Sequence, residues 1–485
     1  MTAIFISMLA IPVLCAVLVL FVREARSILR ICVWGSVATA ILTVVCAQRA
    51  FSTSLFAIGR QLMFDSLSAY HALLVVGVFS LSSVYACAYF APAIADGSFD
   101  EEKARGFGTL WFLFLGSMLL TVSSNNAGLM WVAMEATTIT SALLVCLDRD
   151  QPSVQAAWTY LLMCSVGIAL ALVGILVACA EAQGVSPDSS SIFLWTTLRE
   201  IAPQLSPGAA RLAFIFALVG FGTKAGLAPM HGWLPEAHGH APTPVSAVLS
   251  GVLLNCALYC LSRFVLIVEP SNPGWTSHVL VPFGVLSVAV AAAFIVHERD
   301  IKRLLAFSTV EHMGIIILGF GFGAYGAALF HTFNHSICKM MSFFCSGALV
   351  QRYRTRDMSK MHGTLGHESV AGSGFLLGLF ALIGLPPFSI FMSELWIARA
   401  GIAEEHIVAV VAFLSAVALA FIATVLRAVE MTWAEAEGPA PDGSVGRIRL
   451  ELVALPLALL FLLGVWMPQP LSNMIAGAAS FIGGG

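Results

Sequence analysis

Long apolar runs separated by short polar stretches restrict the fold of this chain more than any other feature. A helix that crosses the hydrocarbon core of a bilayer needs about 20 apolar residues, and about 14 such runs follow one another, the first of them at residues 3–22. Only 11% of the 485 residues are charged, whereas an ordinary soluble domain carries roughly 25%. The sequence therefore predicts an all-α, polytopic membrane protein and excludes a soluble enzyme or a disordered chain.

Composition and motifs also exclude several kinds of site. The formal net charge of −3 includes no basic surplus that would indicate a nucleic-acid partner. The 11 Cys are scattered singly through apolar runs without any Cys-x-x-Cys pair, so neither a cysteine zinc site nor an iron–sulfur cluster is expected. Phosphate-binding and dinucleotide-binding motifs are missing from the sequence. We therefore expect the chain itself to bind no metal and no cofactor.

The distribution of Lys and Arg among the connections predicts the orientation. With the N-terminus outside and about 14 spans, roughly 16 Lys and Arg fall on the cytoplasmic side and about 6 outside, in agreement with the positive-inside rule. The cytoplasmic groups include Arg23, Arg26 and Arg30; Lys103 and Arg105; Arg299, Lys302 and Arg303; Arg352, Arg354, Arg356 and Lys360; and Arg447 and Arg449. Both termini are then expected on the outer side.

Two predicted spans contain helix breakers at corresponding depths, one between Lys224 and Pro229 and the other at Pro386 and Pro387. Proline removes a helix hydrogen bond, and such a break in a membrane is tolerated only where protein or water satisfies the freed backbone groups. Paired broken helices are typical of transporters with inverted repeats, although two simple kinks are the alternative. The predicted division is helices 1–3 in residues 1–105, a first inverted five-helix repeat in 106–267, a second in 277–430 and helix 14 in 450–485, with helices 7 and 12 broken.

Four ionisable side chains fall in the middle of predicted spans. Such a residue costs about 2.5–3.5 kcal/mol near the bilayer centre, so each of the four requires a reason. Burial favours the neutral form of a Lys and a nearby Glu favours its charged form, so a Lys facing a movable Glu can alternately hold and release a proton. We predict that proton translocation depends on these four residues, with static ion pairs as the alternative: Glu135, Lys224, Lys339 and Glu394.

Histidines supply further groups that can carry protons. His331 and His335 are spaced i, i+4 and share a helix face with Lys339, and imidazole is well suited to proton transfer at neutral pH. The His-rich segment 231–240 predicts a hydrated loop that gates proton uptake, with a rigid corner or a metal site as alternatives. The predicted relay and gate histidines are His231, His238, His312, His331 and His335.

Three ordered segments resemble one known family. They are Gly222-Thr-Lys224 continued by Pro229-Met-His231-Gly-Trp-Leu-Pro235-Glu236-Ala-His238-Gly-His240, Asp300-Ile-Lys302-Arg303, and His331-Thr-Phe-Asn-His335-Ser-Ile-Cys-Lys339. They resemble the antiporter-like, proton-translocating membrane subunits of complex I, of the Mrp-type cation/proton antiporters and of energy-converting hydrogenases. The segment from Ser246 to Asn255 is most similar to the hydrogenase-4 component F branch.

The resemblance implies a role for each buried charge. In the family, a Glu on the fifth helix partners a Lys on the broken seventh, and a Lys on the eleventh and a Lys or Glu on the broken twelfth complete the path. The matching positions here are Glu135, Lys224, Lys339 and Glu394. Many relatives carry a Lys or His on the eighth helix, where this chain has Asn255. Because Asn cannot titrate, the link between the two lysines is expected to run through water and through His331 or His335.

The resemblance also implies an assembly. We expect a non-catalytic, proton-translocating subunit of a redox-driven complex of the complex I or hydrogenase-4 type, in the plasma membrane of a prokaryote. Its expected partners are the lipid bilayer, other membrane subunits and a peripheral redox arm that carries Fe–S and other redox centres. A cation (Na⁺)/proton antiporter component without redox coupling is the first alternative. A metal transporter and a purely structural membrane protein are the others.

Overall fold

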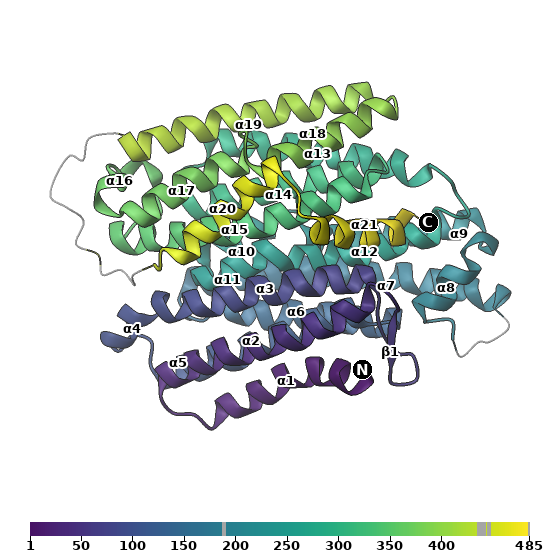
Figure 1. Cartoon of the computed structure of the whole chain (residues 1–485), viewed down its shortest axis with the longest axis horizontal. Helices are drawn as coiled ribbons and strands as arrows, with labels where there is room; N and C mark the ends of the chain where they lie inside the picture. The colour runs from purple at the N-terminus through teal and green to yellow at the C-terminus, as the bar shows by residue number, and fades with distance from the viewer. Residues whose placement is uncertain (187–190, 434–442, 444–447, 484–485) are drawn as a thin grey trace.

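The computed structural model describes residues 1–186, 191–433, 443 and 448–483, so Arg447 of the predicted cytoplasmic groups lies outside the described residues. Within that part the chain is almost entirely helical (Figure 1), which confirms the all-α class. A single antiparallel hairpin, β1 (Leu55–Ala57) with β2 (Leu62–Phe64), is the exception among the described residues, and the sequence did not predict it. It lies near the chain termini, which are both placed toward the same end of the helix bundle.

The helices follow one another along the chain with short connections. The first group is α1 (Thr2–Leu20), α2 (Ala25–Ala50), α3 (Ser66–Tyr89), α4 (Ala91–Ala95) and α5 (Glu101–Ser123). The second is α6 (Ala127–Val145), α7 (Gln151–Val185), α8 (Trp195–Ile201), η1 (Ala202–Gln204), α9 (Pro207–Ala225), α10 (Trp233–His240), α11 (Thr243–Val248), the π-helical turn η2 (Leu249–Leu253) and α12 (Leu254–Val268). The third is α13 (Trp275–His297), α14 (Ile301–Gly321), α15 (Tyr325–Tyr353), η3 (Met358–Lys360), α16 (Thr364–His367), α17 (Ser369–Leu382), α18 (Ser389–Ala403), α19 (Ile407–Trp433), α20 (Glu451–Val465) and α21 (Gln469–Gly483).

Eleven helices in the described part are long and apolar enough to cross a membrane, or up to 12 if the bent pair α20 and α21 forms one span. At 29 residues, α15 is also long enough to span, but His, Asn, Lys and Ser side chains lower its hydropathy. The two halves of the second broken span, α17 and α18, are each too short. The predicted number of about 14 spans and the two inverted repeats stay predictions.

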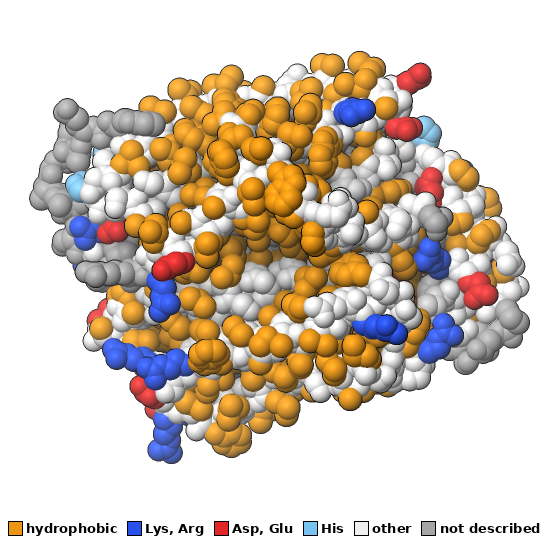
Figure 2. Space-filling model, viewed as in Figure 1, with side chains coloured by type: hydrophobic (Ala, Val, Ile, Leu, Met, Phe, Trp, Pro, Cys, Tyr) orange, Lys and Arg blue, Asp and Glu red, His pale blue; other side chains and the backbone are white. Residues whose placement is uncertain are grey.

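The core of the molecule is formed by helices that have no lipid-facing side. The continuous segment Thr243–Val268 and helix α14 are enclosed on all sides, whereas α1 and α19 bury only 28% and 22% of their most apolar stretch. On the face shown in Figure 2, hydrophobic side chains cover much of the surface between the ends of the bundle, where most of the charged side chains lie. An apolar surface of that extent requires lipid or neighbouring apolar subunits as its environment. Large exposed apolar side chains include Leu14, Trp34, Val166, Val408 and Leu455.

Both predicted helix breaks are present. Helix α9 ends at Gly226 in the left-handed conformation (φ +74°), and α17 is followed by Gly384 with φ +67°. The Ala228–Pro229 and Pro386–Pro387 peptide bonds are cis. The predicted hydrated loop at 231–240 is wrong, because residues Trp233–His240 form the short helix α10 and its Trp233 and His238 side chains are fully buried. The chain therefore fills the first break with a packed helix rather than with an open loop.

Candidate functional site

Lys224 occupies the last turn of the broken helix α9 and is completely buried. Its Nζ donates hydrogen bonds to Thr138 Oγ1 of α6 (2.9 Å) and to Tyr160 Oη of α7 (2.7 Å). Close packing of α7 on α9 makes the second contact possible, since a Cβ at Gly220 would collide with the backbone of α7 at Ala171. The ammonium is thus held by two hydroxyls in the interior of the protein.

Glu135 is the predicted partner of Lys224 on α6, but the two side chains do not form a direct ion pair. The Thr138 hydroxyl lies 3.4 Å from Glu135 Oε2 and 3.4 Å from the Met134 carbonyl oxygen of its own helix, and it accepts from Lys224 Nζ at the same time. Glu135 Oε1 accepts a hydrogen bond of 2.5 Å from Ser165 on α7. A hydroxyl therefore separates the Glu135 carboxylate from the Lys224 ammonium. The structure contains no direct ion pair between these two residues, which was the alternative to a proton-transfer role.

Lys339 is the second buried lysine and points from α15 to α14. Its Nζ donates to the Leu305 carbonyl oxygen (2.7 Å) and to Ser308 Oγ (2.8 Å). One turn farther along α14, Glu311 is only 7% exposed and interacts electrostatically with Lys339. Lys224 resembles Lys339 in one respect, because its hydroxyl partner Thr138 is also three residues from a Glu on the same helix, Glu135. Glu311 was not among the residues selected from the sequence, although a carboxylate next to His312 in an apolar span was a readable signal.

Three helices bring histidines and the last predicted carboxylate together. His312 Nδ1 of α14 lies 2.9 Å from His331 Nε2 of α15, and His331 Nδ1 lies 2.9 Å from Ser393 Oγ of α18. One carboxylate oxygen of Glu394 and one nitrogen of each of the two histidines lie within 4.8 Å of one another. The His335 ring is 5.2 Å from the His312 ring, centroid to centroid. The face of α15 that carries His331, His335 and Lys339 thus contacts α18, the second half of the second broken helix, through His331.

The break between α17 and α18 makes room for Glu394. A Cβ at Gly384 would overlap the Glu394 carboxylate at Oε2, and the positive φ of this residue also favours glycine. The carboxylate is 8% exposed. The sequence Gly384-Leu-Pro-Pro therefore does two things at once, ending α17 and leaving space for a charged group.

Helix α10 lies between the two buried lysines. Its Trp233 ring stacks on Tyr160 at 4.5 Å, and its His238 ring lies 5.6 Å from Phe343 of α15. His238 Nδ1 is hydrogen-bonded to the Leu234 carbonyl (2.9 Å), while its Nε2 has no partner within the described part of the chain. His238 also interacts electrostatically with Lys339. This helix connects the surroundings of Lys224 with those of Lys339.

Asn255 and His231, also predicted for the relay, have other positions. Asn255 Nδ2 donates to the Gly251 carbonyl and to Ser336 Oγ, both at 2.8 Å, and so ties α12 to α15 next to the π-helical turn η2. His231 packs against Phe294 and Phe307. Among the described residues it makes no hydrogen bond or ring contact with the other predicted histidines. The structure therefore brings three of the five predicted histidines, His312, His331 and His335, into contact with one another. His238 lies on α10 and interacts with Lys339, and His231 lies apart.

A charged cluster at one end of the bundle joins two of the sequence segments that carried the resemblance. Arg303 of α14 forms ion pairs with Glu236 of α10 (2.6 Å) and with Glu298 (3.0 Å). His240 Nε2 lies 3.9 Å from Glu236 Oε2. Partial burial, together with the nearby Arg356 guanidinium, lowers the pKa of His240 below its ordinary value. The cluster anchors the end of α10 to the start of α14.

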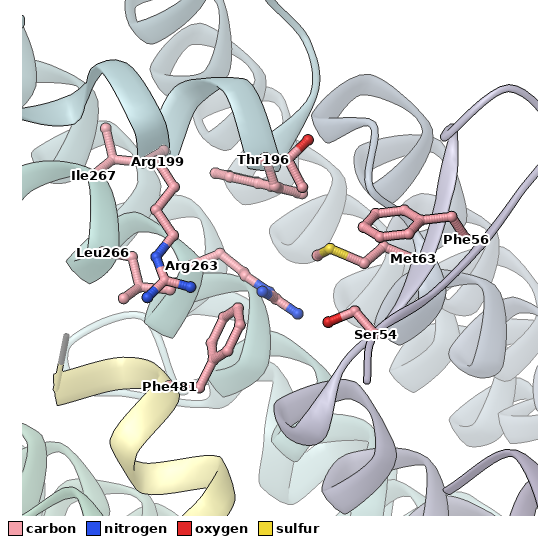
Figure 3. A pocket seen from close by; sticks show the side chains of 10 residues that line it. Ser54, Phe56, Met63, Thr196, Arg199, Arg263, Leu266, Ile267 and Phe481 are labelled. Carbon is pink, nitrogen blue, oxygen red and sulfur yellow. The ribbon is translucent and has the colours of Figure 1, made fainter. Parts of the chain in front are cut away.

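A buried ion pair lies outside the predicted set of residues. Arg263 of α12 and Asp65, the N-cap of α3, approach to 2.8 Å with exposed fractions of 2% and 1%. The Phe481 ring of α21 lies 4.9 Å from Arg263 and 4.4 Å from Arg199, and these side chains line a cavity of about 140 Å³ (Figure 3). Because the Arg263 charge is satisfied by Asp65, this pair ties α3, α12 and α21 together as a structural element.

Comparisons with known proteins bear on what this arrangement does. A family described as NADH:quinone oxidoreductase/Mrp antiporter, transmembrane, matches residues 124–420. A hydrogenase-4 component F homolog of Methylacidiphilum infernorum is 35% identical over 84% of this chain and 86% of its own length. A Na⁺/H⁺ antiporter subunit of Alkalihalophilus pseudofirmus is 30% identical over 68% of this chain and 41% of its own length. The archaeal membrane-bound sulfane sulfur reductase contains a chain of the same fold, with a TM-score of 0.86, 20% identity and coverage of 99% and 97%.

Proposed function

Because the chain belongs to the NADH:quinone oxidoreductase/Mrp antiporter family of antiporter-like membrane subunits, we propose that it moves protons through its buried polar groups as part of a redox-driven complex. The observation that carries the proposal is the row of titratable side chains enclosed by apolar helices. The neighbours of these side chains are hydroxyl, imidazole and carboxyl groups, and direct ion pairs are not found at them among the described residues. The side chains are Glu135, Lys224, Lys339 and Glu394. Burying an ionisable group at this depth costs free energy, and such groups in membrane helices usually mark a path for ions or protons.

The first step of the proposed mechanism takes place at Lys224. When the Glu135 carboxylate is close, its charge favours the protonated lysine, and the Thr138 hydroxyl bridges the two groups. When Glu135 withdraws, burial favours the neutral lysine, and the proton leaves. A conformational change in a neighbouring subunit would drive this movement, because Glu135 is the less buried of the two groups.

The released proton must then cross to the second half of the chain. His238 of α10 is the titratable group placed between the two lysines, and it acts on Lys339 electrostatically. From Lys339 the proton passes along α14 through Ser308 and Glu311 to the paired imidazoles of His312 and His331. Glu394 then exchanges it with the other side of the membrane. In this proposal His238 takes the place that the non-titrating Asn255 cannot fill.

The proposal includes the orientation and the partners. We place both termini on the outer side of a prokaryotic plasma membrane and the cluster of Arg303, Glu236 and Glu298 on the cytoplasmic side. Other membrane subunits would cover part of the apolar outer surface, and a peripheral arm would hold the Fe–S and other redox centres. The relatives named above support a membrane complex of this kind.

The test is proton translocation by the reconstituted complex carrying Lys224→Met. We expect electron transfer to continue while proton movement per electron falls to background, because the first loading group is lost. Lys360→Met is the matched control, since Lys360 is an exposed lysine that forms an ion pair with Asp357 at 3.8 Å. Unchanged proton movement in the Lys224→Met complex would refute the proposal.

The second candidate is a cation (Na⁺)/proton antiporter subunit that works without redox chemistry. The match to the Na⁺/H⁺ antiporter protein of Alkalihalophilus pseudofirmus favours it. The two candidates differ in what drives transport. Sodium-dependent proton movement in vesicles without any electron donor would select the antiporter, whereas movement that requires turnover of a redox partner would select the first proposal.

A further inference from the structure

We propose that His312, His331 and Glu394 form a binding site for a divalent transition-metal ion of the Zn²⁺ class, and that an ion bound there blocks proton movement. The three residues are called the His₂Glu cluster below. Binding of the metal is independent of the proposed function, whereas the block rests on it. We infer an inhibitory site for an added ion, not a metal that the fold requires.

The ligand atoms have the right chemistry and come from three separate helices. One nitrogen of His312 on α14, one nitrogen of His331 on α15 and one oxygen of Glu394 on α18 lie within 4.8 Å of one another. Two imidazoles and a carboxylate, with a fourth position left open, are a common ligand set of Zn²⁺. Imidazole ligands favour Zn²⁺, Co²⁺ or Cu²⁺ over Na⁺ and Mg²⁺, which prefer oxygen.

The spacing of the two imidazoles requires little adjustment. His312 Nδ1 and His331 Nε2 are 2.9 Å apart, and two nitrogens bound tetrahedrally at 2.0–2.1 Å from Zn²⁺ are about 3.3 Å apart. The two nitrogens therefore need to move apart by only a few tenths of an ångström, while the rings turn so that both lone pairs point at the ion. An ion between them replaces the proton that now joins the two rings.

Ser393 sets the orientation of one ligand. Its hydroxyl proton is donated to the Ile390 carbonyl (2.8 Å), so its oxygen accepts the N–H of His331 Nδ1 at 2.9 Å. The lone pair of His331 is then on Nε2, which faces His312. Histidines that bind metals are held in the same way, by a hydrogen bond to the nitrogen that does not bind.

The electrostatics of the cluster also favour a dication. Glu394 forms no ion pair within the described part of the chain, and it interacts electrostatically with a second buried carboxyl group, Glu311. Two carboxylates near one another in a low-dielectric interior are unfavourable unless a proton or a cation compensates them. A divalent ion would balance the two carboxylates.

The position of the cluster explains why a bound ion would stop transport. Glu394 is 8% exposed, while His312 and His331 are 1% and 0% exposed, so an ion reaches the cluster past Glu394. Once bound, it occupies the nitrogen lone pairs through which His312 and His331 would exchange a proton. Each of the two imidazoles then loses its ability to accept a proton from the Glu311 side.

The binding test uses Co²⁺ with the purified complex, since tetrahedral Co²⁺ with nitrogen and oxygen ligands absorbs strongly in the visible range. We expect His331→Asn and Glu394→Gln to weaken binding at least 10-fold. Ser393→Ala keeps all three ligands and should weaken it by about 10-fold, as loss of a supporting hydrogen bond does at other metal sites. The control is His297→Ala, an exposed histidine outside the cluster. Thermal unfolding of each variant confirms that it is folded.

The transport test adds ZnCl₂ to the reconstituted complex and then removes it with a chelator. We expect reversible inhibition of proton movement in the wild type and in His297→Ala, and a shift of the inhibition to higher Zn²⁺ concentration in Ser393→Ala. Unaltered Co²⁺ spectra and affinity in both His331→Asn and Glu394→Gln would overturn the site. Co²⁺ binding at the cluster without inhibition by Zn²⁺ would overturn the block. Proton movement that is absent even without metal would instead contradict the proposed function and leave the site standing.

Discussion

The hydroxyl between Glu135 and Lys224 can be removed by a single substitution. Thr138 is completely buried, accepts a hydrogen bond from Lys224 Nζ at 2.9 Å and lies 3.4 Å from Glu135 Oε2. Thr138→Val keeps the branched shape of the side chain and its packing, but removes the oxygen. Lys224 would keep Tyr160 as its partner and lose the link to the carboxylate.

The size of the effect follows from the kind of hydrogen bond that is lost. A hydrogen bond to a charged group contributes about 1.5–3 kcal/mol, so the protonated form of Lys224 should be disfavoured by a factor of roughly 10 to 150. The equilibrium constant for protonation of Lys224 should fall by the same factor, and the fraction of Lys224 that carries a proton should fall with it. The protons moved per electron should then decrease strongly while electron transfer continues.

The assay compares proton movement and electron transfer in proteoliposomes that contain the complex. Thr140→Val is the matched control, because the Thr140 hydroxyl is on the same helix but donates to the Ala136 carbonyl of its own helix (2.7 Å). We expect Thr140→Val to behave as the wild type. If Thr138→Val and Thr140→Val show the same proton-to-electron ratio as the wild type, the bridging role of Thr138 is wrong.

Three further predictions concern other parts of the molecule. Glu311→Gln should slow proton movement about as strongly as loss of Lys339, because it removes the carboxylate that faces Lys339; a Gln variant with normal rates would exclude Glu311 from the path. Arg263→Met should destabilise the protein by about 3–5 kcal/mol because it leaves the buried Asp65 charge unpaired, whereas Asp65→Asn combined with Arg263→Met should recover much of that loss in thermal unfolding. The lowered pKa of His240 means that the unfolded chain binds more protons than the folded one near pH 6. Stability of the wild type should therefore fall as the pH drops through about 6.5, and His240→Gln should make this pH dependence weaker; equal slopes for both proteins would contradict the assignment.

The sequence predicted the class of protein and its four charged residues within spans, because both depend on composition over a single span. Lys224, Lys339 and Glu394 are buried, and Glu135 is partly exposed. A run of about 20 apolar residues nearly always forms a membrane-spanning helix, and a Lys or Glu within such a run is easily recognised. The two breaks were also predictable, since Gly and Pro act on the local backbone. The hairpin of β1 and β2 and the helix α10 were not, because short elements of mixed polarity depend on what packs around them.

The partners of the buried charges were decided by the tertiary structure alone. Thr138, Tyr160 and Ser308 carry hydroxyls that are common in membrane helices, so nothing in the sequence distinguishes them from side chains that bond their own backbone. Likewise His312, His331 and Glu394 lie on three helices that are distant along the chain. The sequence by itself determined which ionisable side chains lie within apolar spans, where their burial costs free energy. Only the packing of α6, α7 and α9, and of α14, α15 and α18, decided which groups meet, because hydrogen bonds and charges act over a few ångströms in space and not along the chain.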